Sequence, residues 1–188
     1  ICCQKVSEAE VFLAGGINDV LVTNEVIGKR KVTALASLAI RYPKATIGVC
    51  VDDVRQVRQL ATACRALAAE IEVYIELDVG HGRAGVPDTP AVVDLAREIK
   101  LHKNLRLRGL QAYYGSAQHR RTVRERRQAI TLAAGLAGAS AMDGVSLRRG
   151  RSTRNVAPSP GAVSSSTAPP WAAVMAAKRA TGSQGRPL

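Results

Sequence analysis

Hydrophobic and polar positions along the chain follow two different periods up to about Asp143. Short runs rich in β-branched and other apolar residues predict strands, and longer runs with apolar positions three or four residues apart predict helices. The predicted strands are "DVLVTN" (19–24), "TIGVCVDD" (46–53), "EVYIELDVG" (72–80) and "LRLRGLQAYYG" (105–115), and "ICCQ" (1–4) is typical of the end of another. The predicted helices span residues 28–41, 54–69, 90–102 and 120–138.

This alternation, at roughly 20 to 35 residues per unit, is typical of a parallel α/β sheet or barrel. Two of the strands also have one apolar and one polar face. In a barrel, Glu76, Asp78, Gln111 and Tyr113 would point inward near the mouth, whereas a half-solvated sheet face would explain the same alternation. The helical connections favour the barrel, so we predict a partial (β/α)8 TIM-type barrel of about five βα units in residues 1–143.

The composition changes abruptly after the last predicted helix. Residues 144–188 contain five Gly, five Pro and seven Ser, and carry seven of the 27 basic residues but none of the 15 acidic ones. This composition predicts a disordered basic tail. The abrupt switch favours a frameshift over a natural tail, and translation of the other reading frames of the gene would distinguish the two.

Three broad classes of protein are disfavoured. The net charge of +12 is concentrated in the tail, and 3% aromatic residues are too few for a base-stacking surface, which disfavours a nucleic-acid-binding module. No apolar run approaches the ~20 residues of a membrane span, and the first residues of the given sequence do not have the pattern of a secretory signal. The four cysteines show no zinc-site spacing and predict buried thiols in a reducing cytoplasm.

In parallel α/β folds, functional groups gather at the carboxyl ends of the strands. Some of the polar residues there have a simpler interpretation. Asn24 could cap the next helix, and Asp52 and Asp53 are typical N-caps of the helix starting at Val54, which is the favoured interpretation for the aspartates. The full set at the predicted strand ends is Gln4, Lys5, Asn24, Asp52, Asp53, His81, Arg83, Tyr113, Tyr114, Ser116 and His119.

The segment Gly80–Gly85, "GHGRAG", matches the G-x-G-x-x-G fingerprint of dinucleotide-binding folds by its letters. That fingerprint needs a helix that begins inside the motif, so that the helix N-terminus meets the pyrophosphate. Here "VPDTP" follows, and Thr89 with Pro90 predicts an N-cap and first turn only at that point. What remains is a loop whose glycines let the backbone approach a flat ligand, with Arg83 as its functional side chain. Because arginine stays protonated, Arg83 could donate to a ring nitrogen; pairing with a carboxylate is the alternative.

Five segments, in order, resemble one known family: "ICCQKVSEAEV", "DVLVTNEV", "IGVCVDD", "IELDVGHGRAGV" and "LRGLQAYYGSAQH". Together they are similar to the D-threonine aldolase group, which includes 3-hydroxy-D-aspartate aldolases and D-serine dehydratases among the alanine-racemase-like (fold type III) pyridoxal-phosphate enzymes. The resemblance covers residues 1 to about 140. It implies a barrel that holds pyridoxal 5'-phosphate at its mouth and a second, β-rich domain. The implied reaction is retro-aldol cleavage of D-β-hydroxy-α-amino acids to glycine and an aldehyde, with a divalent metal of the manganese type.

The same resemblance implies roles for individual residues. Arg83 corresponds to the arginine that faces the pyridine nitrogen, and Gln4 and Asn24 lie in segments that line the cofactor pocket. Tyr113 resembles the tyrosine near the cofactor. His119 matches a histidine on the substrate side and is a candidate acid or base, or else a surface histidine at a helix start. The implied partners are a small D-amino acid and, for the longer protein, a second copy of the chain.

The chain also departs from the family pattern. The family's Schiff-base lysine lies upstream of "CCQKVSEAE", and Lys5 follows a different strand. The phosphate loop expected near residue 138, the last barrel strands and the metal-binding residues are missing, and His81 and Ala84 replace the usual loop residues. We therefore expect a cytoplasmic lyase fragment that is inactive by itself. A D-serine dehydratase-type lyase and a catalytically dead binding protein are the alternatives.

Overall fold

The computed structural model describes residues 1–143 of the 188-residue chain. The two interpretations of residues 144–188, a natural basic tail and a frameshift, lie outside the described residues.

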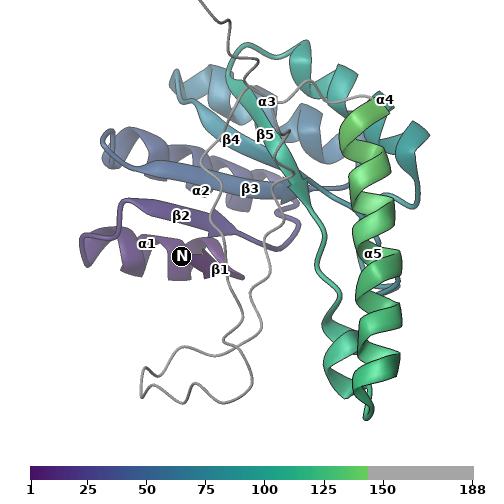
Figure 1. Cartoon of the computed structure of the whole chain (residues 1–188). Helices are drawn as coiled ribbons and strands as arrows, with labels where there is room; N and C mark the ends of the chain where they lie inside the picture. The colour runs from purple at the N-terminus through teal and green to yellow at the C-terminus, as the bar shows by residue number, and fades with distance from the viewer. Residues whose placement is uncertain (144–188) are drawn as a thin grey trace, which may run out of the picture.

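Five strands form one sheet in the order of the sequence (Figure 1). Every neighbouring pair is parallel. Because parallel crossovers are right-handed, sequential order places the connecting helices on one face of the sheet, as in successive units of a β/α barrel. The predicted class, with about five βα units of a barrel, is therefore confirmed. The strands are β1 (Cys2–Cys3), β2 (Asp19–Val22), β3 (Thr46–Val51), β4 (Ile71–Glu76) and β5 (Leu105–Gln111).

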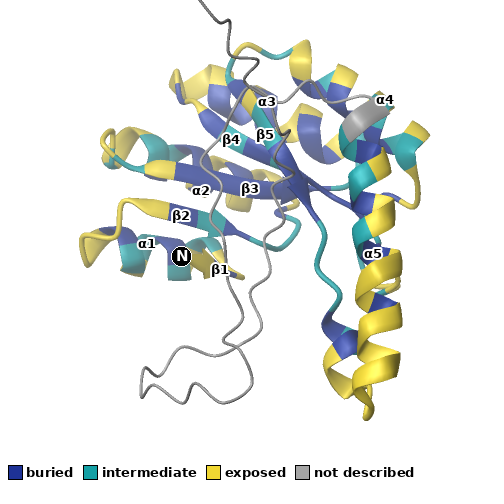
Figure 2. Cartoon of the chain, viewed as in Figure 1, coloured by how far each residue is buried: buried dark blue, intermediate teal, exposed yellow. Residues whose placement is uncertain are grey.

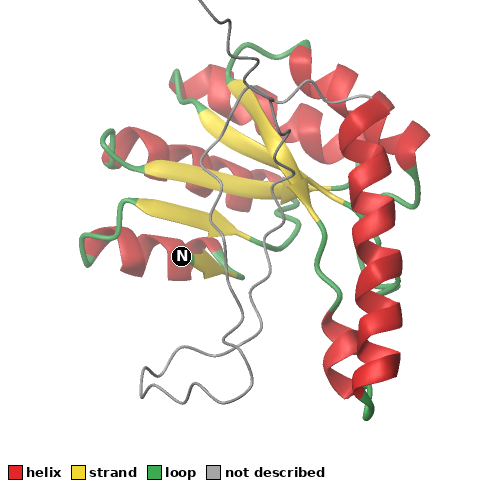
Figure 3. Ribbon diagram, in the orientation of Figure 1, coloured by secondary structure: helices red, strands yellow, loops and turns green. Residues whose placement is uncertain are grey.

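The helices alternate with the strands, and loops connect the two at the strand tips (Figure 3). In α2, the buried positions Val32, Leu35, Ala36 and Leu38 recur at helical spacing and form the stripe that packs on the core. The helical elements are α1 (Val6–Ala14), α2 (Lys29–Arg41), α3 (Val54–Leu67), α4 (Thr89–Lys100), the 3₁₀ helix η1 (Gly115–His119) and α5 (Val123–Asp143). None of α1 to α5 is long and apolar enough to cross a membrane.

Side chains of aspartate fix two helix starts. Asp53 accepts a hydrogen bond from Arg55 N at 2.7 Å and caps α3, as predicted. The N-cap predicted for Thr89 is wrong, because Asp88 lies one residue earlier in extended backbone and accepts from Ala91 N at 2.9 Å. The cap predicted for Asp52 is also wrong, since its carboxylate turns toward a different loop.

The core lies between the sheet and its covering helices (Figure 2). Val49, Val51, Val73 and Ile75 are at most 1% exposed. On the opposite face, the Tyr74 ring lies over Gly48, where an added Cβ would come within 3.1 Å of it.

The predicted burial of the cysteines is confirmed for three of the four thiols. Cys3, Cys50 and Cys64 are buried and free, whereas Cys2 is exposed at the edge strand β1, so the prediction of burial is wrong there.

Candidate functional site

The carboxyl ends of β2, β3 and β4 bring three loops together. Arg83, in the loop after β4, donates through Nη1 to Asn24 Oδ1, in the loop after β2, at 3.2 Å across 59 positions of sequence. Asn24 does not cap α2, whose N-cap is Gly28. Within residues 1–143, Arg83 forms no ion pair with a carboxylate, so the alternative interpretations of both residues are wrong. Two predicted site residues therefore meet.

The glycine loop is folded around a carboxylate of the chain itself. Asp78 Oδ1 accepts hydrogen bonds from the backbone N–H groups of Gly80 (2.9 Å), His81 (2.8 Å) and Gly82 (3.0 Å). The hydrogen bond from Gly82, with those from Gly80 and His81, lowers the pKa of Asp78. The amides that would cradle a phosphate are thus already occupied, and the first helix after the loop begins only at Thr89. This agrees with the rejection of a dinucleotide fingerprint.

A second carboxylate anchors the far end of the loop. Gly85 N donates to Asp52 Oδ2 at 3.0 Å, which links the loop to the end of β3. Asp78 N donates to Val86 O, and Val86 N donates to Glu76 O, both at 2.9 Å. A Cβ at Gly85, where φ is +106°, would lie 2.5 Å from Asp78 N. The loop is closed at its base, and Arg83 lies exposed near its tip.

Beneath the loop, the inner face of the sheet carries polar groups that lack partners. Glu76 is 5% exposed and Gln111 is 6% exposed. Among the described residues, Glu76 Oε2, Gln111 Oε1 and Glu25 Oε1 have no hydrogen-bond partner. Burial and, next, the nearby Glu25 raise the pKa of Glu76 to about 8, although a hydrogen bond with Cys50 and the charge of Arg83 act in the opposite direction.

The sequence predicted some of these buried polar groups but not others. Strand alternation predicted that Glu76 and Gln111 point inward, and their burial confirms this. The nearness of Glu76 to the charge of Arg83 was not predicted. Glu25 carried no sequence signal, because an acidic residue after a strand usually faces solvent.

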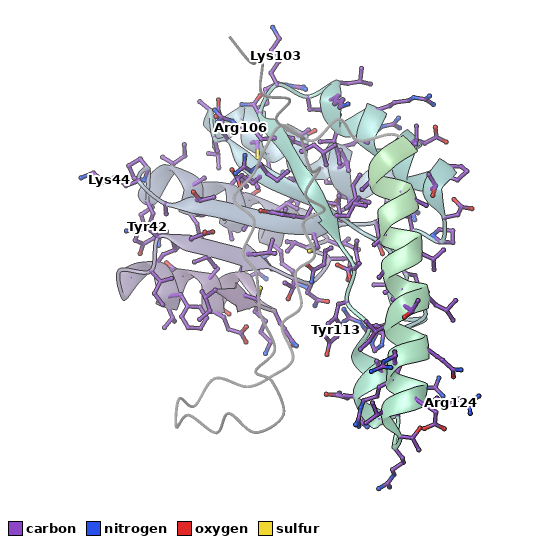
Figure 4. All side chains as sticks on the ribbon, viewed as in Figure 1. Tyr42, Lys44, Lys103, Arg106, Tyr113 and Arg124 are labelled. Atoms are coloured by element: carbon purple, nitrogen blue, oxygen red, sulfur yellow. The ribbon has the colours of Figure 1, made fainter. Side chains whose placement is uncertain are left out.

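Aromatic rings of the segment after β5 pack against the glycine loop. Tyr113 and His81 meet edge to face, with ring centroids 5.7 Å apart and planes at 61°. A Cβ at Gly115 would come within 2.8 Å of the Tyr113 ring and 3.0 Å of the His81 ring, so glycine is required for this contact. Tyr113 follows the end of β5, on the side of the molecule where η1 and α5 meet (Figure 4).

Gln4 and His119 are not brought into this contact network. Gln4 is exposed, and its backbone N donates to Glu8 Oε2 at 2.9 Å in the first turn of α1. His119 is exposed at the end of η1, and its ring nitrogen lies 3.5 Å from the Gln118 side-chain amide. The roles implied for these two residues stay predictions.

The described residues include six lysines and no cluster of metal ligands. The described lysines are all exposed, and Figure 4 shows Lys44 and Lys103 at the opposite end of the sheet from Tyr113. The others are Lys5, Lys29, Lys31 and Lys100. Within residues 1–143, no three His, Cys, Asp or Glu side chains gather in a geometry that could hold a metal ion.

Together, these features define a class: sequential parallel βα units with an arginine-bearing glycine loop at the carboxyl edge, as in β/α barrels that bind a ligand at this edge. The family model described as alanine racemase, N-terminal domain, matches residues 1–163, and the chain belongs to this family of fold type III pyridoxal-phosphate enzymes. The predicted resemblance is confirmed.

Two relatives and one crystal structure show which members of the family the chain is similar to. The chain is 44% identical over 135 residues to 3-hydroxy-D-aspartate aldolase of Paracoccus denitrificans (strain Pd 1222), covering 71% of the chain and 34% of the relative. It is 44% identical over 141 residues to D-threonine aldolase of Arthrobacter sp, covering 75% and 36%. The crystal structure of D-threonine aldolase from Filomicrobium marinum superposes with a TM-score of 0.70 at 45% identity, covering 74% of this chain and 37% of that one. The chain thus spans about a third of the length of these relatives.

Proposed function

We propose that this chain forms the cofactor-binding part of a pyridoxal-phosphate-dependent lyase that cleaves D-β-hydroxy-α-amino acids to glycine and an aldehyde. The contact between Arg83 and Asn24 at the carboxyl edge of the sheet carries this proposal. The similarity to two aldolases at 44% identity supports the reaction type.

The residues at this edge fit the ring of the cofactor. Arg83 offers a guanidinium that Asn24 orients, and Tyr113 with His81 provides an aromatic wall beside the loop. The backbone at Gly80 and Gly82, with φ of +110° and +67°, allows a close approach without side chains. When bound, the cofactor supplies an electron sink for the bond that breaks. Its phosphate group would bind outside the glycine loop, since Asp78 occupies those amides.

The remaining predicted residues complete the proposed assignment. Gln4 follows β1, the strand beside β2, and would line the pocket next to Asn24. His119 would exchange a proton with the substrate, since its imidazole is exposed at the end of η1. In the longer relatives, a divalent metal of the manganese type would assist the reaction.

We further propose that the chain by itself binds the cofactor but does not catalyse the reaction. All six described lysines are exposed, and Lys44 and Lys103 lie at the opposite end of the sheet from Tyr113. A covalent attachment point for the cofactor would then come from sequence outside this chain.

Dehydration of the same class of substrate is the second candidate reaction. The structure of D-threo-3-hydroxyaspartate dehydratase from Delftia sp. HT23 superposes with a TM-score of 0.59 at 25% identity over 77% of the chain. Product analysis of the longer protein would separate the two reactions, since cleavage yields glycine and an aldehyde and dehydration yields a 2-oxo acid and ammonia.

Binding of a cofactor analogue tests the proposed function. The ligand 4'-deoxypyridoxine 5'-phosphate has no aldehyde and cannot react with surface lysines, so calorimetric titration of the full chain reports the pocket alone. Arg83→Ala removes a charged hydrogen-bond donor, and we expect affinity to fall about tenfold. Arg97→Ala, at an exposed arginine of α4 that pairs with Asp94, is the control and should bind as the wild type does. Equal affinity for the two variants would contradict the assignment of Arg83.

A further inference from the structure

Two buried acceptors face each other across neighbouring strands. Glu76 ends β4 and Gln111 ends β5, and the two residues are Cα partners in the parallel register. Both side chains point to the inner face of the sheet, are 5% and 6% exposed, and keep one oxygen without a donor among the described residues. Adjacent strands lie about 4.8 Å apart, so side chains of register partners are immediate neighbours.

An unpaired buried acceptor is unfavourable, and an ionised buried carboxylate is more so. If Glu76 is ionised, its Oε2 and Gln111 Oε1 are both acceptors, and neither can satisfy the other. If Glu76 carries a proton on Oε2, that oxygen becomes a donor, and Gln111 Oε1 is the adjacent acceptor. A single proton therefore removes both unsatisfied groups.

The charges around Glu76 favour the same state. Glu25 after β2 and Asp52 after β3 add negative charge, whereas a hydrogen bond with the Cys50 thiol on β3 acts in the opposite direction and is outweighed by burial. Arg83 is the positive charge that acts on Glu76, but its side chain donates its hydrogen bond to Asn24. Three carboxyl groups thus share one arginine, and protonation of one of them reduces their mutual repulsion.

We propose that Glu76 holds a proton in the folded protein and donates it in a hydrogen bond to Gln111, as a neutral positioning residue that leaves the charge of Arg83 available to the ring nitrogen of a ligand. The statement about the ligand rests on the proposed function, whereas the protonation of Glu76 does not. The raised pKa of Glu76, caused mainly by burial, agrees with the geometry.

Carbon-13 NMR of the full chain measures the proton directly. The side-chain carboxyl carbons of labelled glutamate report ionisation, and the Glu76 signal is the one that Glu76→Gln removes. We expect its titration midpoint near 8, well above the ordinary range of a glutamate side chain. A Glu76 midpoint in the ordinary range would overturn the proposal; Gln111 would then donate its amide to an ionised carboxylate.

Unfolding by urea at different pH values is the second readout. The folded-state pKa of Glu76 is raised, so the folded state binds the proton more tightly than the unfolded state does. This contribution to stability is complete below about 4.5 and is lost as the pH rises through about 8. We expect Glu76→Gln to remove this decline. Glu72→Gln, on the same strand and paired with Arg108, should keep it. Identical pH profiles for wild type and Glu76→Gln would contradict the proposal.

Binding of 4'-deoxypyridoxine 5'-phosphate tests the statement about the ligand. Ionisation of Glu76 would offset the charge of Arg83, so the wild-type affinity should fall as the pH rises past 8, beyond any change seen with Glu76→Gln. Parallel pH dependence in both proteins would overturn the positioning role. Absence of binding at every pH, with a raised NMR midpoint, would remove the proposed function while the protonation of Glu76 still stands.

Discussion

Asp78 Oδ1 receives three consecutive backbone N–H groups, and this one atom determines how the loop after β4 can be used. A phosphate-binding loop leaves such amides free for its ligand. Here they hold the chain's own carboxylate, and Arg83 is the side chain presented outward. Although "GHGRAG" matches the dinucleotide-binding fingerprint by its letters, its backbone amides are not free to bind a phosphate.

Gly85 offers a sharp test of the loop at the scale of one residue. An alanine there would need φ of +106° and would bring its Cβ within 2.5 Å of Asp78 N, so the backbone must move. We expect Gly85→Ala to lower the free energy of unfolding by about 2 kcal/mol and to weaken binding of the cofactor analogue. Gly135→Ala, inside α5 with no atom near the added Cβ, is the matched control and should raise stability by up to ~1 kcal/mol in urea unfolding. An unchanged unfolding free energy in Gly85→Ala would show that the loop is not held as described.

The sequence predicted which way some of these side chains point but not which residues they contact. Alternation along β4 and β5 predicted Glu76 and Gln111 as inward-facing, because the period of a strand is a local property. The prediction that Asp52 caps α3 was wrong because the contact of its carboxylate depends on a residue distant in the sequence. An aspartate before a helix is typical of a cap, and only its contact with Gly85, 33 positions away, shows its other use.

At the scale of elements, side-chain hydrogen bonds decided where the predicted helices begin and end. The last helix was predicted from Arg120 but begins at Val123, where Thr122 and Glu125 form a reciprocal cap: Thr122 N donates to Glu125 Oε2 at 3.0 Å, and Glu125 N donates to Thr122 Oγ1 at 3.2 Å. The "T-x-x-E" spacing was present in the sequence as a signal. The 3₁₀ helix at Gly115–His119 is too short to give a period.

The loop that carries Arg83 leads directly into helix α4, and the Asp88 side chain caps the start of this helix. Asp88→Ala removes the acceptor for Ala91 N, and we expect a loss of about 1 kcal/mol in the free energy of unfolding, measured in urea. Asp94→Ala, an exposed residue of the same helix whose ion pair with Arg97 is solvent-exposed, should change it by less than ~0.5 kcal/mol. Equal effects of the two substitutions would mean that the cap contributes nothing specific.

At the scale of the molecule, five βα units in sequence order present their strand ends to one edge, and the ligand-facing loops follow from this topology. The fold class was predictable because strand and helix periods, with right-handed crossovers, leave few arrangements. The contacts inside the site could not be predicted in the same way, because the site is assembled from four different segments. These segments contribute Asn24, Asp52, Arg83 and Gln111. The chain covers about a third of the length of its aldolase relatives, so the complete reaction belongs to a proposal about the longer protein.

The central claim is that the glycine loop and Asn24 contact the ring of pyridoxal phosphate. Two-dimensional ¹H–¹⁵N NMR of the full chain, titrated with 4'-deoxypyridoxine 5'-phosphate, tests this most directly. We predict that the amide signals of Gly80, Gly82 and Gly85 and the side-chain amide of Asn24 shift together along one saturable binding curve, while Gly135 in α5 does not move. Saturable shifts confined to residues outside these loops, or no saturable shift at all, would contradict it.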